Sequence, residues 1–105
     1  MSPVEPKFLS IAEVLYLHDV SLRRYGGSAG IREHGLIESA LGSAQNAFWY
    51  GRGGLFEIAA ASAFHLAEAQ SFIDGNKRTA AASAISFLRK NACVFQKTTA
   101  RFIGP

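Results

Sequence analysis

The sequence predicts an all-α protein, and three observations support this fold class. Apolar residues recur at helical spacing in several separate stretches. A capping box and glycine or asparagine stops mark where these stretches begin and end. No two stretches alternate apolar and polar residues as a strand pair would, although Cys93–Gln96 has the composition of a short extended piece. We therefore expect helices joined by loops.

The chain has the size of one domain. It has 105 residues, and two domains of half that length would each be too small to bury a useful core. Hydrophobic residues make up 49% and charged residues 18%, which is too apolar for a disordered protein. We expect a single folded domain over residues 1–105.

Composition also argues against several classes of protein. The apolar runs are far shorter than the roughly 20 residues of a membrane-spanning helix. The N-terminus lacks the basic and apolar regions of a secretory signal, which predicts a cytoplasmic protein. The net charge of +3 is scattered, so we expect no nucleic-acid-binding face, whereas an anionic ligand or acidic protein partner is compatible. The single cysteine, Cys93, is expected to be a buried and inert thiol.

The first predicted helix covers residues 11–25. Ser10 and Glu13 have the spacing of a capping box, in which each side chain accepts from the other residue's backbone N–H. Gly26 and Gly27 supply the stop. The apolar residues at helical spacing are Ile11, Val14, Leu15, Leu17 and Leu22.

Two loops surround a short helix in the middle of the chain. Residues 26–35 are rich in glycine and are expected to form an exposed loop. The short helix then runs through Leu36, Ile37, Ala40 and Leu41. Residues 45–54 combine glycines with Phe48, Trp49 and Tyr50, so a loop is expected there, either packed on the core or serving as a substrate flap.

Two longer helices complete the predicted fold. The first covers residues 55–69, where alanines form a smooth face that allows another helix to approach closely. After a break at residues 70–75, the second covers residues 76–90 and carries an apolar stripe. Asn91 is the expected stop.

The loop between these two helices carries the chemistry. Lys77 and Arg78 lie in the first turn of a helix, whose positive dipole end favours anions, so they are misplaced unless a negative group binds there. Exposed amides, a glycine and two cations together suit phosphate. Asp74 is suited to hold Mg²⁺ through one carboxylate. The alternative is that Asp74 only caps the helix while both cations extend into solvent.

The residues around this loop resemble a known family. Phe72-x-Asp74-Gly75-Asn76-Lys77-Arg78-Thr79-Ala80 resembles the Fic/death-on-curing signature His-x-Phe-x-Asp/Glu-Gly/Ala-Asn-Lys/Gly-Arg. The flanking stretches Phe64-His65, 87–91 and 30–40 resemble the toxin branch of that family. The resemblance covers about residues 8–95.

The resemblance implies a compact helical domain with a phosphate-binding loop between two central helices. It implies that Asp74 binds Mg²⁺, that Gly75 and Asn76 form an anion nest, and that Lys77 and Arg78 contact the phosphates of ATP. Phe72 is implied to anchor the loop in the core. A lysine at position 77 is typical of the death-on-curing branch, which is similar to a kinase acting on elongation factor Tu. Such toxins are paired with a small antitoxin whose disordered tail folds onto the toxin.

One position departs from the family signature. Gln70 stands where the family has its catalytic histidine, and an amide cannot take a proton from the attacking hydroxyl. His65 lies roughly 140° around the helix axis from Gln70 and is expected to be a buried, hydrogen-bonded structural histidine. His34 is expected in an exposed loop, and neither it nor His18 has a partner at zinc-ligand spacing. Relatives typically continue with a further helix, whereas Lys97–Pro105 shows no helical periodicity.

Three hypotheses for function remain at the level of sequence. The chain is a toxin-family protein disarmed at Gln70, either in nature or by deliberate substitution. Alternatively, it is a working transferase that uses another base or relies on positioning and electrostatics. In the third hypothesis it is a binding module for an antitoxin-like partner, with a vestigial nucleotide loop.

Overall fold

The computed structural model describes residues 6–49 and 54–91. The described part contains four helices, α1 (Ile11–Tyr25), α2 (His34–Trp49), α3 (Leu55–Ala69) and α4 (Asn76–Lys90). Its β-structure is limited to one isolated antiparallel bridge between Ile31 and Phe72. The all-α prediction is therefore confirmed. None of the helices in the described residues has the length and hydrophobicity needed to cross a membrane.

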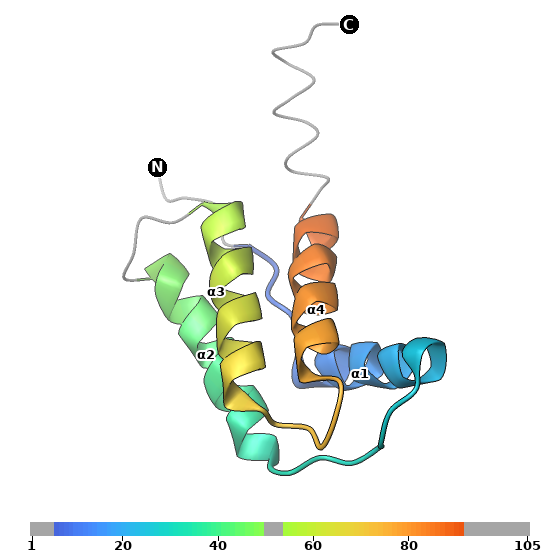
Figure 1. Cartoon of the computed structure of the whole chain (residues 1–105). Helices are drawn as coiled ribbons and strands as arrows, with labels where there is room; N and C mark the ends of the chain where they lie inside the picture. Colours follow the sequence, from blue (N-terminus) through green and yellow to red (C-terminus); the bar gives the residue numbers. More distant parts are fainter. Residues whose placement is uncertain (1–5, 50–53, 92–105) are drawn as a thin grey trace, which may run out of the picture.

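Three of the helices form one layer, and α1 lies across one end of this layer. Figure 1 shows α2, α3 and α4 running alongside one another, and α3 packs against both of its neighbours. The first helix, α1, lies crosswise near the N-terminal end of α4 and contacts α4 and α2. The connection from α1 to α2 passes beside the loop that joins α3 to α4. This arrangement brings the N-terminal third of the chain against the predicted phosphate loop.

The hydrophobic core lies between the helices. Phe8, just before α1, packs edge-on against Phe48 at 6.1 Å between ring centroids and lies at a tilt of 31° to Phe87 at 6.2 Å. Every helix and the α3–α4 loop contribute buried apolar side chains, which are Leu9, Val14, Ile37, Ala40, Leu41, Ala44, Ile58, Ala59, Leu66, Phe72, Ala80 and Phe87.

The predicted bounds of α1 are confirmed, and the capping signals explain them. The Ser10 hydroxyl accepts from the Glu13 amide at 3.2 Å, and the Glu13 carboxylate accepts from the Ser10 amide at 2.9 Å. At the other end, Gly26 has a φ of 80° and donates its N–H to the Leu22 carbonyl at 2.8 Å. Both ends are thus set by local hydrogen bonds.

The second helix is longer than the sequence predicts. It begins at His34, inside the predicted loop, and continues to Trp49, so the loop prediction is wrong over residues 45–49. Ala44 is buried and Phe48 packs against the core, so burial of one face stabilises these last turns as helix. The core-packing alternative therefore holds for Phe48, whereas the neighbouring Trp49 is 58% exposed.

The predicted bounds of α3 and α4 are also confirmed. Asn91 ends α4, and its side chain donates to the Phe87 carbonyl and exchanges two hydrogen bonds with the backbone of Lys7. Lys90 donates to the Phe8 carbonyl at 3.1 Å and to Glu13 at 2.7 Å. These contacts tie the end of α4 to the start of the chain. The predictions for Tyr50, Cys93, the extended piece 93–96 and the end 97–105 lie outside the described residues.

Candidate functional site

The loop between α3 and α4 is anchored by Phe72. This side chain is 2% exposed, as the motif predicts for an anchor. Its ring stacks on the ring of His18 from α1 at a centroid distance of 3.7 Å and an interplanar angle of 9°. This contact between two residues 54 positions apart in the sequence therefore holds the loop against α1.

The Asn76 side chain closes the loop on itself. Its Oδ1 accepts from the Phe72 amide at 3.0 Å, and its Nδ2 donates to the Phe72 carbonyl at 2.9 Å. The side-chain amide therefore makes the same pair of bonds that a neighbouring strand would make. Asn76 contributes to a nest only through its backbone N–H, because its side chain is engaged with Phe72.

The N-terminus of α4 presents amides that have no protein acceptor. Gly75 is the N-cap, with a left-handed φ of 79°, and no side chain caps the helix. The amides of Asn76, Lys77 and Arg78 have no acceptor among the described residues, as expected for the first turn of a helix. A left-handed residue followed by a helical turn forms a concave set of donors that suits an anion.

Asp74 does not cap α4, so that alternative is wrong. Its carboxylate instead accepts from the Ser28 amide at 3.1 Å and from the Gly75 amide at 2.9 Å. These two hydrogen bonds lower the pKa of Asp74, with a smaller contribution from the positive charge of Arg78. The group is exposed and ionised at neutral pH, and its oxygens keep lone pairs that face solvent.

The residues present fit a Mg²⁺ ion bound through one carboxylate. The described residues contain no cluster of three or more His, Cys, Asp or Glu side chains that could enclose a metal. Mg²⁺ usually binds through one or two carboxylates, with water and phosphate oxygens completing its octahedron. An exposed, ionised Asp74 beside free helix amides matches that pattern.

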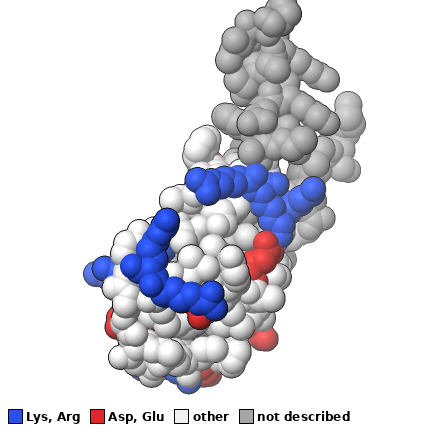
Figure 2. All heavy atoms as spheres, turned by 90° about the vertical axis from the view of Figure 1, so that its right-hand side faces the viewer, with Lys and Arg blue, Asp and Glu red and all other residues white. Residues whose placement is uncertain are grey.

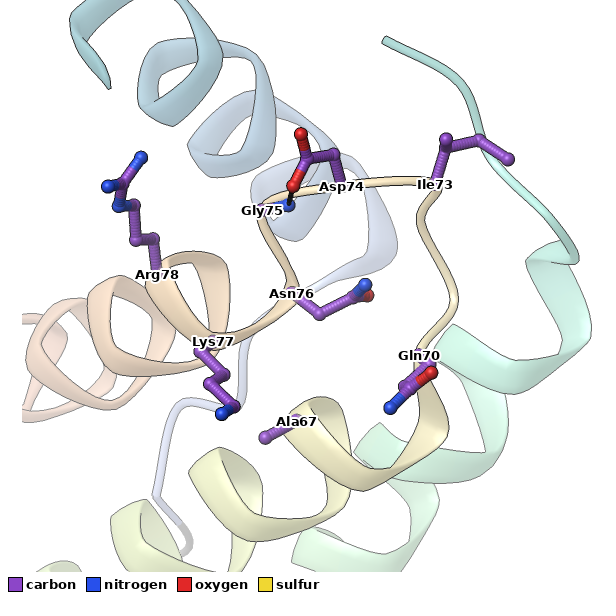
Figure 3. A pocket seen from close by; sticks show the side chains of 8 residues that line it. All are labelled: Ala67, Gln70, Ile73, Asp74, Gly75, Asn76, Lys77 and Arg78. Atoms are coloured by element: carbon purple, nitrogen blue, oxygen red, sulfur yellow. Dashed lines mark hydrogen bonds between the residues drawn. The ribbon is translucent and has the colours of Figure 1, made fainter. Parts of the chain in front are cut away.

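The two cations of the loop diverge. The Arg78 guanidinium lies over the ring of Tyr25, the last residue of α1, with its carbon 4.6 Å from the ring centroid. Figure 3 shows Asp74 and Arg78 projecting to one side of the loop, whereas Lys77 points toward the end of α3 near Ala67. Arg78 is therefore held by α1 and does not extend freely into solvent.

Gln70 lies at the end of α3 in a left-handed conformation. It is the C-cap, with φ and ψ both 48°, and is the one non-glycine residue with positive φ among the described residues. Such a conformation costs of order 1 kcal/mol for a residue with a Cβ and occurs often at functional sites. The Gln70 carbonyl accepts from the Arg32 guanidinium at 3.4 Å, while its exposed side chain faces the cavity.

All the predicted site residues line one open cavity. Its volume is about 390 Å³, and Figure 3 shows the side chains that line it. The lining residues are Ala67, Gln70, Ile73, Asp74, Gly75, Asn76, Lys77 and Arg78. The structure thus brings together every residue of the site that the sequence predicts.

Basic side chains gather near this cavity. Figure 2 shows Lys and Arg side chains in two separate groups on the face that includes the end of α1, with white surface between the groups. Arg23 and Arg24 belong to the last turn of α1, next to Tyr25 and the Arg78 stacked on it. Positive charge next to Arg78 favours the approach of an anionic ligand.

A short backbone pairing with the α1–α2 connection also holds the loop. The Arg32 amide donates to the Ser71 carbonyl at 2.7 Å, and the Ile73 amide donates to the Gly30 carbonyl at 3.1 Å. These bonds flank the bridge between Ile31 and Phe72. The segment that the sequence marks only as an exposed loop therefore supports the site.

The histidines differ from expectation. His65 is half-buried and meets the Phe64 ring edge-on at 5.2 Å, and its ring has no hydrogen bond among the described residues, so the prediction of a buried, bonded histidine is wrong. His34 is exposed, but it starts α2. His18, which the sequence reasoning passed over, contacts the loop directly. Its place on the apolar stripe of α1 was the signal that could have identified it.

Comparisons with known proteins agree with this geometry. The sequence profile described as "Fic/DOC family" matches residues 8–88. The chain is similar to "Protein kinase doc" of Escherichia phage P1, with 38% identity over 86 residues, which cover 81% of this chain and 68% of that protein. The matched span contains α3, the whole loop and α4 as far as Leu88. The chain therefore belongs to the Fic/DOC family.

Proposed function

We propose that the α3–α4 loop binds ATP with Mg²⁺ and that the site serves transfer of a phosphoryl or nucleotidyl group to a protein hydroxyl. The observation that carries this proposal is that the start of α4 with its free amides, Arg78 and the ionised Asp74 all line one open cavity. Membership of the Fic/DOC family supports it. The chain would act in the cytoplasm, where ATP and protein acceptors are available.

Each residue of the loop has a proposed role. The amides at the start of α4, together with Arg78, bind the phosphate oxygens through charge-assisted hydrogen bonds. Lys77 supplies a second cation from the other side of the cavity. Asp74 holds Mg²⁺, which neutralises charge on the phosphates when bound.

The transfer step requires a proton acceptor. The hydroxyl oxygen of the acceptor protein attacks the γ-phosphorus, the bond to the β–γ bridging oxygen breaks, and ADP leaves while the hydroxyl proton passes to a base. The Gln70 amide has no pKa near neutrality and cannot take this proton. We therefore propose that the chain is inactive or impaired as it stands. The name of its relative, a protein kinase, favours phosphoryl over nucleotidyl transfer.

Restoring a histidine at position 70 tests the proposal. The assay compares the parent, Gln70→His, and Gln70→His combined with Arg78→Ala, with elongation factor Tu as the candidate acceptor. Label at the γ-phosphate or the α-phosphate of ATP separates phosphoryl from nucleotidyl transfer. General-base assistance is worth about 10²–10⁴-fold, so label should appear on the acceptor only with Gln70→His. Both residues carry a Cβ, so the backbone strain at this position is unchanged.

Two outcomes would contradict this assignment. If the parent transfers label as fast as Gln70→His, Gln70 is not the impaired position. If the Arg78→Ala double variant keeps the full rate, Arg78 does not contact the phosphates.

A second candidate function is non-catalytic binding of an antitoxin-like partner. The observation that favours it is Gln70 itself, because a chain without the base can keep its fold and its surfaces. The test is to purify the parent with the product of any small reading frame next to its own. A stable complex together with no ATP binding would favour this function over transfer.

A further inference from the structure

His18 is a buried polar residue to which the proposed chemistry assigns no role. It belongs to the middle of α1 and is 6% exposed. An apolar ring would fill the same space without the cost of burying a polar group. The contacts of His18 nevertheless concentrate on the phosphate loop, 54 to 57 positions further along the chain.

The ring contacts three positions of that loop. It stacks on Phe72 at 3.7 Å between centroids, and its Nε2 lies 2.8 Å from the Asp74 carbonyl oxygen. A carbonyl can only accept, so Nε2 carries the proton and donates it. The ring also lies against Gly75, where an added Cβ would come within 3.6 Å of the His18 Cδ2.

One peptide group connects this hydrogen bond to the carboxylate. The carbonyl of the Asp74–Gly75 peptide accepts from His18, and the N–H of the same peptide donates to Asp74 Oδ1 at 2.9 Å. A rotation of that peptide would therefore break both bonds together. The remaining oxygen, Oδ2, accepts from Ser28 at 3.1 Å, on the connection that follows α1. The orientation of the Asp74 carboxylate thus depends on the His18 donor.

We propose that His18 is a positioning residue, which orients the Asp74–Gly75 peptide and through it the Asp74 carboxylate. The consequence for magnesium rests on the proposed function, whereas the effect on the loop does not. Asp74 and the first amides of α4 lie on either side of this peptide, so its orientation sets the distance between a bound cation and the phosphates. Without the His18 donor, the loop samples other orientations of the peptide.

Two substitutions at His18 distinguish the effect of its N–H donor from the effect of its aromatic ring. His18→Phe keeps an aromatic ring against Phe72 but removes the N–H. His18→Gln removes the stacked ring but keeps an amide N–H at a similar reach. If the donor positions the loop, His18→Phe is impaired and His18→Gln resembles the parent, the reverse of what a purely packing role predicts.

The first measurement needs no nucleotide. Amide hydrogen exchange by NMR follows the Ser28 and Gly75 N–H groups, which both donate to Asp74. In His18→Phe these amides should exchange about tenfold faster relative to the core amides of the same sample, the loss expected for one hydrogen bond. In His18→Gln they should exchange as in the parent. Unchanged exchange in His18→Phe overturns the proposal.

The second measurement concerns the cation. Calorimetry with ATP in the presence of Mg²⁺ and in the presence of a chelator should show a loss of about tenfold in His18→Phe only with Mg²⁺. An equal loss in both conditions indicates general damage to the fold and contradicts positioning. If the parent does not bind ATP at all, the proposed function fails and amide exchange alone decides the role of His18. If His18→Phe does not fold, fast exchange in a folded His18→Gln overturns the proposal.

Discussion

At the scale of single residues, Phe72 connects the loop to the core. Its ring is buried against His18, while its backbone is bonded on both sides by the Asn76 side chain. The side chain therefore contributes packing, and the backbone contributes the shape of the loop. Both contributions depend on the ring staying in place.

Phe72→Ala is expected to lower the free energy of unfolding by roughly 3–5 kcal/mol, because it removes a buried ring and leaves a cavity. Urea unfolding measures the loss. The matched control is Phe64→Ala, which removes a ring that is 61% exposed and should cost less than about 1 kcal/mol. Equal losses for the two variants would show that Phe72 does not anchor the loop.

Gly27 lets the Asp74 carboxylate approach α1. It has a φ of 121°, and an added Cβ would lie 2.8 Å from Asp74 Oδ2. Gly26, its neighbour, has a φ of 80°, and an added Cβ there would meet nothing within 4 Å. Alanine substitutions at these two glycines therefore distinguish the effect of backbone strain from the effect of displacing the carboxylate.

We expect Gly26→Ala and Gly27→Ala each to lose about 1–3 kcal/mol of stability from the positive φ. Only Gly27→Ala should also weaken Mg²⁺-dependent binding of ATP, because its new methyl group pushes the carboxylate away from Ser28. Calorimetry with and without Mg²⁺ measures this difference. A Gly26→Ala variant that loses the same affinity would mean that strain alone is responsible.

At the scale of elements, α1 and α4 are tied together through Glu13. Its carboxylate caps α1 at Ser10 and also accepts from Lys90 at the end of α4. The hydrogen bond from Lys90, followed by that from the Ser10 amide, lowers the pKa of Glu13. The folded pKa therefore lies below the unfolded value near 4.5.

This shift predicts how stability depends on pH. A lowered folded pKa adds stability that is present above about pH 4.5 and is lost as the pH falls through the folded value. The ion pair between Glu13 and Lys90 is partly exposed. Glu13→Gln should therefore lower the free energy of unfolding by about 0.2–1 kcal/mol at pH 7 and by clearly less at pH 3, as measured by urea unfolding. Glu13→Gln made on a Lys90→Met background should cost less at pH 7 than it does on the parent. A cost independent of pH would show that the carboxylate charge does not contribute.

At the scale of the whole molecule, two other parts of the chain hold the α3–α4 loop in place. α1 supplies His18 and Tyr25, the following connection supplies Ser28 and the backbone of Gly30, and the α3–α4 loop supplies the binding groups. A ligand that binds the loop should therefore stabilise the entire fold, because the loop cannot keep its shape when α1 separates from it.

We expect ATP with Mg²⁺ to raise the Tm. Ligand at 100 times its Kd adds about 2.7 kcal/mol, and each kcal/mol raises the Tm of a domain this size by about 4–8 °C. Arg78→Ala should reduce the affinity by about 1.5–3 kcal/mol through loss of a charge-assisted bond. Arg89→Ala is the control, because it removes the same charge from an exposed residue in the last turn of α4, at the end of that helix away from the loop. Equal affinity of Arg78→Ala and the parent would rule out the phosphate contact.

Features that depend on neighbouring residues can be predicted from the sequence alone. The bounds of α1 and the end of α4 follow from the capping box at Ser10, the glycines after Tyr25 and the stop at Asn91. The family and the composition of the site were also readable, because the motif is contiguous. Where burial rather than local signal decides, as at Phe48 in α2, the prediction of a loop was wrong.

The way the site is held depends on contacts between distant parts of the chain. Asp74 is oriented by Ser28 and His18, which lie 46 and 56 positions away, and Arg78 is held by Tyr25. These partners have no fixed spacing to the motif in the sequence. They meet it because α1 crosses the end of α4. The residue types in the loop state which ligand it suits, whereas the orientation of their side chains depends on contacts that exist only after the helices pack.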